Sequence, residues 1–153
     1  GGGLKYKRPC IWIKPDGTPQ FNGECPGLGF ECFVAAWCGS GRSKWNGGGK
    51  HGVYTFLKDS ANKASTHPTE KPVKLMQALI RDFTNQGELI LDPFMGSGTT
   101  GVACAKMGRK FIGIELDEKY FDISCRRIEE AYKQPDLFVQ QPSISQQTSM
   151  EGI

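Results

Sequence analysis

A glycine-rich turn at residues 92–100 constrains the fold of this chain more than any other feature. The apolar run at residues 89–91 predicts a short buried strand immediately before it. Gly96 and Gly98 let the backbone turn sharply and approach a ligand closely. The helix predicted at residues 99–107 directs its N-terminal amides to the same place. This pattern is typical of a cofactor-binding turn in an α/β protein.

A second apolar run, residues 110–114, predicts the next strand of a βαβ unit. Glu115 at its end is placed to accept hydrogen bonds from two ribose hydroxyls, which indicates a cofactor with a nucleoside. Residues 96–101 satisfy G-x-G-x-x-G and so favour a dinucleotide such as NAD, but a lone match of this kind is weak. S-adenosylmethionine is the alternative, because its small carboxylate and ammonium suit the same amides together with Asp92.

Three linked segments favour the second cofactor: HPTEKP at residues 67–72, DPFMGSGTT at residues 92–100 and GIE at residues 113–115. With these motifs, residues 67–130 resemble the C-terminal half of a DNA amino-methyltransferase. More narrowly, they resemble the circularly permuted (beta-type) class that methylates adenine N6 or cytosine N4. Residues 8–56 resemble the family more loosely.

The resemblance implies S-adenosylmethionine as the cofactor. Asp92 would lie near its methionine ammonium, Glu115 would hold the ribose, and Thr69 and Lys71 would approach its carboxylate. His67 and Pro68 would shape the turn. The complete set of implied cofactor-binding residues is Thr69, Lys71, Asp92, Pro93, Phe94, Gly96, Ser97, Gly98, Thr99, Thr100, Glu115 and Leu116.

The chain departs from the family in one respect: it contains no Pro-Pro dipeptide. The family's catalytic motif, (D/N/S)-P-P-(Y/F/W), holds the target amine and stacks the flipped base. We therefore expect no catalytic residue in this chain, and no methylation by the chain alone. Another segment or a second polypeptide would complete an active enzyme. The alternatives are a catalytically inactive descendant that binds DNA or a partner, and, ranked last, an NAD-type oxidoreductase.

The resemblance implies an α/β fold, a partial Rossmann-like methyltransferase fold with a mixed, mainly parallel sheet. Three further strands are predicted, within residues 8–15, 30–37 and 53–56. We expect Phe30–Trp37, apolar almost throughout, to be buried on both faces. The resembled fold has a seven-stranded sheet, so two middle strands lack candidates, which predicts an unpaired apolar edge.

Three helices are predicted. The first begins in residues 69–72, with Pro72 in its first turn, and ends at Gly87; its apolar positions follow i, i+3, i+4, i+7 spacing. Gly108 ends the second. Asp117 is the predicted N-cap of the last, Glu118–Lys133, whose charged residues are assigned to its solvated face.

Charge is distributed unevenly: residues 1–76 contain 11 Lys/Arg against 5 Asp/Glu, and residues 77–153 contain 8 against 11. A basic half suits contact with a nucleic-acid backbone. Residues 39–52 are polar and rich in glycine, and fall where the resembled family has its target-recognition region. The predicted contacts with double-stranded DNA are Lys14, Arg42, Lys44, Trp45 and Lys50. The alternative is a surface loop whose Trp45 packs on its own domain.

The length of 153 residues predicts one domain. Residues 1–7 are interpreted as a scar or linker, residues 8–133 as the methyltransferase-like portion and residues 134–153 as a polar, disordered tail. No run is long and apolar enough for a membrane helix. The six cysteines contain no C-x-x-C pair, so we expect reduced thiols and no metal site. The resemblance implies a cytoplasmic, bacterial or phage-encoded protein.

Overall fold

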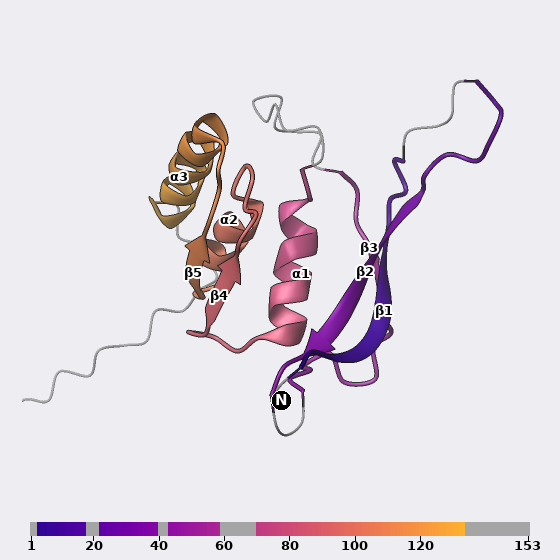
Figure 1. Ribbon diagram of the computed structural model, residues 1–153, viewed down its shortest axis with the longest axis horizontal. Coiled ribbons are helices and arrows are strands. Elements are labelled where there is room, and N and C mark those ends of the chain that lie inside the picture. The colour runs from indigo at the N-terminus through magenta and orange to yellow at the C-terminus, as the bar shows by residue number, and fades with distance from the viewer. Residues whose placement is uncertain (1–2, 18–21, 40–42, 59–69, 134–153) are drawn as a thin grey trace, which may run out of the picture.

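The computed structural model describes residues 3–17, 22–39, 43–58 and 70–133. Figure 1 shows two small sheets with a helix between them and two further helices beside the second sheet. In chain order the elements are β1 (Lys5–Ile13), β2 (Phe30–Trp37), β3 (Val53–Thr55), α1 (Val73–Phe83), β4 (Leu89–Asp92), α2 (Thr99–Lys106), β5 (Lys110–Gly113) and α3 (Glu118–Lys133). The predicted tail, residues 134–153, lies outside the described residues.

The first sheet has the strand order β2-β1-β3, with β1 antiparallel to β2 and parallel to β3. Trp12 and Tyr54 are buried on one face and form a core cluster with Cys10. The prediction that β2 is buried on both faces is wrong. Exposed and half-buried residues alternate along it, and Val34 is 62% exposed. An edge strand with one covered face gives this alternation whatever its composition.

The second sheet consists of β4 and β5, which are parallel and connected through α2, as the sequence predicts. Ile90 and Phe111 pack against buried residues of α1 and α2, so one face of this sheet is covered. Leu89, Leu91 and Ile112 alternate with them along the strands and are 59%, 59% and 49% exposed. The other face of this sheet is therefore apolar and exposed within the described part of the chain.

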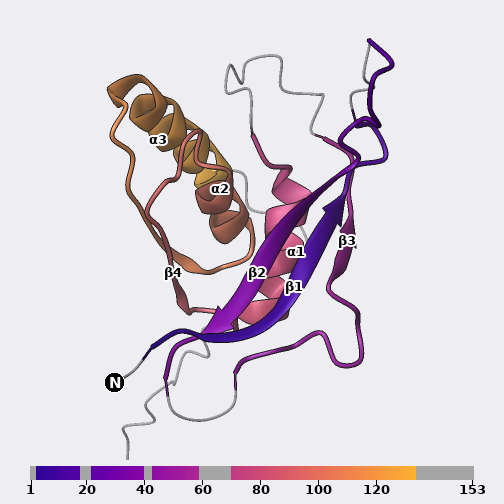
Figure 2. The same cartoon turned by 45° about the vertical axis from the view of Figure 1, so that its right-hand side comes forward.

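Helix α1 lies between the two sheets (Figures 1 and 2). Leu75 and Ala78 belong to the core cluster under the first sheet. Ile80 belongs instead to a second cluster, with Ala103 and Cys104 of α2. Because α1 buries two of its sides, its apolar positions extend beyond the single stripe predicted for it.

The ends of α1 also differ from the prediction. Pro72 is not in the first turn; it is the N-cap, with extended backbone, and its carbonyl accepts a bond from the Met76 amide at 3.2 Å. The C-cap of the helix is Thr84, before Gly87, and both the hydroxyl and the amide of Thr84 donate to the Ile80 carbonyl. Thr84 has an extended φ of −140°, which a helix cannot continue.

The other helix boundaries are close to those predicted. Gly108, with φ of +64°, follows the C-cap of α2. Asp117 caps α3, since its carboxylate accepts a hydrogen bond from the Tyr120 amide at 3.0 Å. None of the helices in the described ranges is long and apolar enough to cross a membrane.

Candidate cofactor pocket

The turn after β4 is held in shape by Asp92. One of its carboxylate oxygens accepts the Phe94 amide at 3.1 Å, and the other accepts the Thr100 hydroxyl at 2.7 Å. The Gly98 amide donates to the Met95 carbonyl at 2.8 Å and closes the turn. Asp92 therefore ties the end of β4 to the start of α2 and fixes the path of the backbone between them.

Gly96 and Gly98 are both required by backbone conformation, with φ of +51° and +80°. Gly98 is also the N-cap of α2. A Cβ at Gly98 would lie 2.7 Å from the Cβ of Ser124, which is fully buried on α3. The glycine spacing thus allows both a sharp turn and close packing of α3 behind it.

Glu115 follows β5 and faces the turn. Its carboxylate accepts hydrogen bonds from the amides of Gly96 at 2.8 Å, Leu116 at 2.9 Å and Asp117 at 3.0 Å. The bond from Asp117, with those from Gly96 and Leu116, outweighs desolvation and lowers the pKa of Glu115 below its ordinary value. An ionised carboxylate at the rim of the turn is a strong acceptor for hydroxyl groups.

A cavity of about 450 Å³ opens between this turn and the segment before α1. Its volume lies in the range of small-molecule sites. The lining combines residues of the glycine-rich turn with the acidic residues Glu70 and Glu115 and the basic residue Lys71. The lining residues are Glu70, Lys71, Met76, Asp92, Phe94, Met95, Gly96, Ser97, Thr99, Thr100 and Glu115.

Most of the residues predicted to bind the cofactor therefore lie around one cavity. Pro93 and Gly98 belong to the same turn but do not line it, and Leu116 is 95% exposed beside it. Thr69 lies outside the described residues, as do His67 and Pro68. Lys71 is in an ion pair with Glu31 at 2.7 Å. Its predicted contact with a cofactor carboxylate stays a prediction.

Sequence reasoning missed several residues at this site. Met76 comes from α1, and Met95 is buried within the turn at 8% exposure. Glu70 lies inside a recognised motif but had no predicted role. Arg127 was assigned to the solvated face of α3, yet its side chain is 17% exposed and reaches back to the turn. The helical position of Arg127, three residues after the buried Ser124, is the signal that could have identified it.

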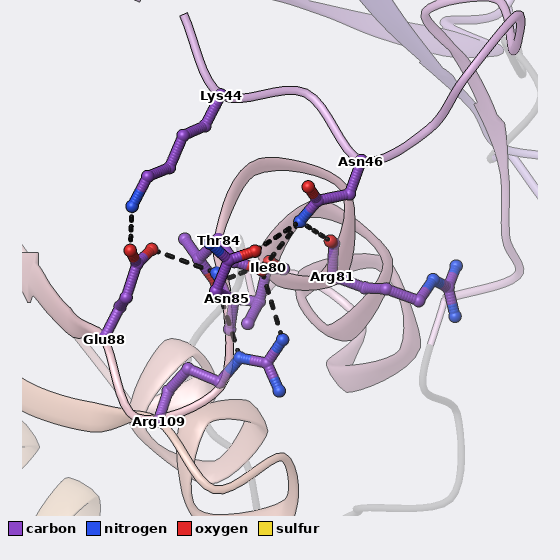
Figure 3. Close-up of polar contacts among 8 residues, drawn as sticks. All are labelled: Lys44, Asn46, Ile80, Arg81, Thr84, Asn85, Glu88 and Arg109. Atoms are coloured by element: carbon purple, nitrogen blue, oxygen red, sulfur yellow. Dashed lines mark hydrogen bonds and ion pairs between the residues drawn. The ribbon is translucent and has the colours of Figure 1, made fainter.

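The loop predicted to contact DNA is folded onto the rest of the chain in its described part, residues 43–50. Trp45 packs edge-on against Phe83 of α1, with ring centroids 5.2 Å apart. Lys44 pairs with Glu88, and Asn46 donates to carbonyls at the C-terminal end of α1 (Figure 3). Lys50 pairs with the buried Asp82 at 2.5 Å. Arg42 lies outside the described residues.

Lys14, the remaining predicted DNA contact, is buried at 8% exposure and pairs with Glu31 at 3.0 Å. Glu31 thus holds two cations, Lys14 and Lys71, and both ammonium groups lie over the Trp12 ring, at 5.3 and 5.7 Å from its centroid. Hydrogen bonds to the two lysines lower the pKa of Glu31 despite its desolvation, which acts in the opposite direction. These contacts link the first sheet to the wall of the cavity.

The six cysteines, all described, are free thiols. Within the described ranges, no group of three or more His, Cys, Asp or Glu side chains is arranged to hold a metal ion.

Residues 35–126 match the family model described as DNA methylase, named for N6 and N4 methyltransferases. The chain is 48% identical over 66 residues to the type II methyltransferase M2.DpnII of Streptococcus pneumoniae, a match that covers 43% of this chain and 25% of that protein. It is 34% identical over 102 residues to M.HinfI of Haemophilus influenzae, covering 63% of this chain and 28% of the relative. The chain thus spans about a quarter of the length of these curated relatives.

Solved structures give a similar result. The complex of M1.HpyAVI with SAM superposes with a TM-score of 0.75 at 32% identity, over 82% of this chain and 63% of that one. The PvuII cytosine-N4-specific DNA methyltransferase superposes with a TM-score of 0.69 at 20% identity, over 86% of this chain and 57% of that one, and this likeness concerns the fold alone. The partial α/β methyltransferase fold, with parallel pairing in both sheets, agrees with the prediction.

Proposed function

The chain belongs to the DNA methylase family, and from this premise we propose that it forms the cofactor-binding part of an S-adenosylmethionine-dependent DNA methyltransferase. The observation that carries this proposal is the cavity bounded by the glycine-rich turn, Glu115 and the Glu70–Lys71 wall. It offers groups of opposite charge within one small volume, as a zwitterionic amino-acid ligand with a ribose requires.

The residues present fit that cofactor. Glu115 is ionised at neutral pH and suits two ribose hydroxyls, and the exposed Leu116 lies beside it, where the adenine would be flanked. The glycine-rich turn and the N-terminus of α2 suit the methionine carboxylate, and Lys71 lines the same cavity. The contact of Thr69 with that carboxylate is part of the proposal, since Thr69 lies outside the described residues. The bound cofactor would supply a methyl group already activated on a sulfonium. The chain's own task is then to bind and orient it, because alignment of the reactants accounts for about 7–11 kcal/mol of such barriers.

Calorimetry on the complete protein tests the cofactor assignment. Glu115→Ala removes the charged acceptors proposed for the ribose hydroxyls. The affinity for S-adenosylmethionine should fall accordingly. Glu118→Ala, in the first turn of α3, is the matched control and should leave it unchanged. Unchanged affinity in Glu115→Ala would sink the ribose assignment, and tight NAD binding would favour the oxidoreductase alternative.

We infer that the methyl acceptor is an exocyclic amine of a DNA base, N6 of adenine in preference to N4 of cytosine. The order of the motifs, HPTEKP before DPFMGSGTT, supports membership of the permuted class. Nucleoside analysis of DNA methylated by the complete protein distinguishes the two bases. Methylation of ring carbon instead of nitrogen would contradict both assignments.

We further propose that these 153 residues need another segment, or a second chain, for transfer. The sequence contains no Pro-Pro dipeptide to clamp a flipped base. The exposed apolar face of β4 and β5 supports the view that more protein packs there. A labelled-methyl assay on mixed-sequence DNA with the purified chain should give background incorporation. Saturable incorporation would refute the proposal and would weaken the inactive-descendant alternative as well.

We propose that the 39–52 loop contacts DNA, and that fewer of its residues than first predicted can be used to test this. Because Lys50 is paired with a buried carboxylate, its loss would disturb folding, so Arg42 and Lys44 are the cleaner test. Replacing both with Gln should flatten the log–log salt dependence of DNA binding by up to about 0.9 per lost phosphate contact. Lys119→Gln on α3 is the control. An unchanged slope would identify the loop as structural.

A further inference from the structure

Arg127 on α3 connects two walls of the candidate pocket from behind. One guanidinium nitrogen donates to the Ser97 carbonyl at 2.7 Å, and another pairs with a Glu70 carboxylate oxygen at 2.5 Å. The same Glu70 oxygen accepts the Thr99 hydroxyl at 3.2 Å. Arg127 itself does not line the cavity, whereas Glu70, Ser97 and Thr99 all do.

Arg127 connects two segments between which the described part of the chain shows no backbone–backbone hydrogen bond. Ser97 belongs to the turn before α2, and Glu70 belongs to the segment before α1. The Glu70 and Arg127 side chains are only 13% and 17% exposed. An ion pair so shielded is screened weakly by salt and holds its partners firmly. The planar guanidinium can satisfy both acceptors at once, which a lysine ammonium on a flexible stem does less well.

The pairing also controls charge at the pocket wall. Without Arg127, the Glu70 carboxylate would lose its ion pair at the wall of the cavity. A carboxylate in that position repels a ligand carboxylate and competes for Thr99. With Arg127 in place, the charge of Glu70 is compensated by the guanidinium, and the Ser97 carbonyl accepts a hydrogen bond from the same side chain.

We propose that Arg127 is a positioning residue for the amino-acid part of the cofactor: it fixes the Ser97–Thr99 turn and Glu70 in the geometry that accepts a zwitterionic tail. The inference rests on the proposed function and deepens it. It assigns Arg127 no contact with the nucleoside, which the proposed function places beside Glu115. A purely structural arginine would affect both parts of the ligand alike.

Two probes separate these cases: S-adenosylhomocysteine, which carries the amino-acid tail, and 5′-methylthioadenosine, which shares the thioadenosine and lacks the tail. Their dissociation constants are measured by calorimetry on the complete protein and on Arg127→Met. We expect S-adenosylhomocysteine affinity to fall roughly tenfold or more, the equivalent of one charge-assisted bond, and 5′-methylthioadenosine affinity to change less than about twofold.

Arg126→Met is the matched control, because Arg126 is the exposed neighbour on α3 and bonds only locally, to the Asp122 carbonyl at 3.3 Å. It should bind both probes as the wild type does. Arg127→Lys retains the charge, and a partial recovery of S-adenosylhomocysteine affinity alone supports the proposal. If Arg127→Met does not fold, Arg127→Lys and Glu70→Gln replace it, and each should weaken the tailed probe selectively.

The outcomes are distinguishable. A wild type that binds neither probe overturns the proposed function, and this inference with it. A wild type that binds both, together with Arg127 variants that weaken both probes equally or neither, overturns this inference alone and leaves the cofactor assignment standing.

Discussion

Gly98 shows how much of this site depends on a single missing side chain. Its positive φ lets the turn close, and its lack of a Cβ lets Ser124 of α3 pack directly behind it. Gly48, with φ of +57°, has the same backbone requirement but no atom near a hypothetical Cβ. Comparing alanine substitutions at these two glycines therefore distinguishes the cost of backbone strain from the cost of a steric clash.

We predict that Gly98→Ala destabilises the protein more than Gly48→Ala does. A residue with a Cβ in the left-handed region costs roughly 1–2 kcal/mol, and both variants lose this amount from their free energy of unfolding. Overpacking against Ser124 adds about 1–3 kcal/mol for Gly98→Ala alone. Urea denaturation measures both values. Equal losses in the two variants would mean that α3 moves aside without cost.

The lowered pKa of Glu115 predicts that the free energy of unfolding falls at acidic pH. Its pKa is lower in the folded protein than the ordinary 4.5, because the Asp117 amide, with those of Gly96 and Leu116, stabilises the ionised form. The folded state therefore binds fewer protons than the unfolded state, so this contribution is present above pH 4.5 and is lost as the pH falls below it.

Glu115→Gln should remove that contribution. The difference in unfolding free energy between wild type and variant should stay constant above pH 4.5 and shrink below it. Thermal or urea unfolding across the acidic range measures this, with Glu118→Gln as the control for loss of one carboxylate. A difference that grows on acidification has the wrong sign for this assignment.

At the scale of elements, the end of α1 depends on a residue far away in the sequence. The Asn46 side-chain amide donates to the Arg81 carbonyl at 3.1 Å and the Thr84 carbonyl at 3.0 Å (Figure 3). The Asn46 backbone amide donates to the Asp82 carbonyl at 2.7 Å. The last carbonyls of a helix have no partner within it, so Asn46 supplies the cap that α1 lacks locally.

Asn46→Ala should therefore destabilise the protein by about 0.5–1.5 kcal/mol, the net contribution of such hydrogen bonds. Chemical denaturation monitored by circular dichroism measures the loss. Asn22→Ala is the matched control, since Asn22 is exposed and its side-chain amide contacts its neighbour Glu24 within the described part of the chain. A loss no larger than that of the control would mean that water replaces the cap.

The elements differed in how well the sequence predicted them. The strands and α3 followed from local patterns, and Asp117 identified the start of α3 through a contact three residues away. The contacts of Asn46, Trp45 and Arg127 join residues more than 25 positions apart. No periodicity or motif encodes such contacts. For that reason the pocket was predicted from its glycines, while its supports were not, and the packing of Trp45 on its own domain was only the second of two alternatives.

At the scale of the whole molecule, α1 links two hydrophobic clusters that would otherwise be separate. Leu75 is 3% exposed in the first cluster and Ile80 is 5% exposed in the second, less than two turns apart. Unfolding of either cluster removes one side of α1 from its packing. We therefore expect the two halves to unfold together.

Leu75→Ala and Ile80→Ala should each cost about 2–5 kcal/mol, and each should lower one common transition. All three tryptophans precede residue 46, so their fluorescence reports on the first half, while circular dichroism is dominated by helices of the second. Coincident curves from the two signals, in both variants, are expected. Separate midpoints would show that α1 does not couple the clusters.

The anchoring of Trp45 and Asn46 on α1 also means that their segment cannot be exchanged as a free loop. A segment transplanted into this chain without these two residues would leave the end of α1 uncapped and Phe83 without its aromatic neighbour. A replacement that preserves folding must therefore keep Trp45 and Asn46 together with the helix that they contact.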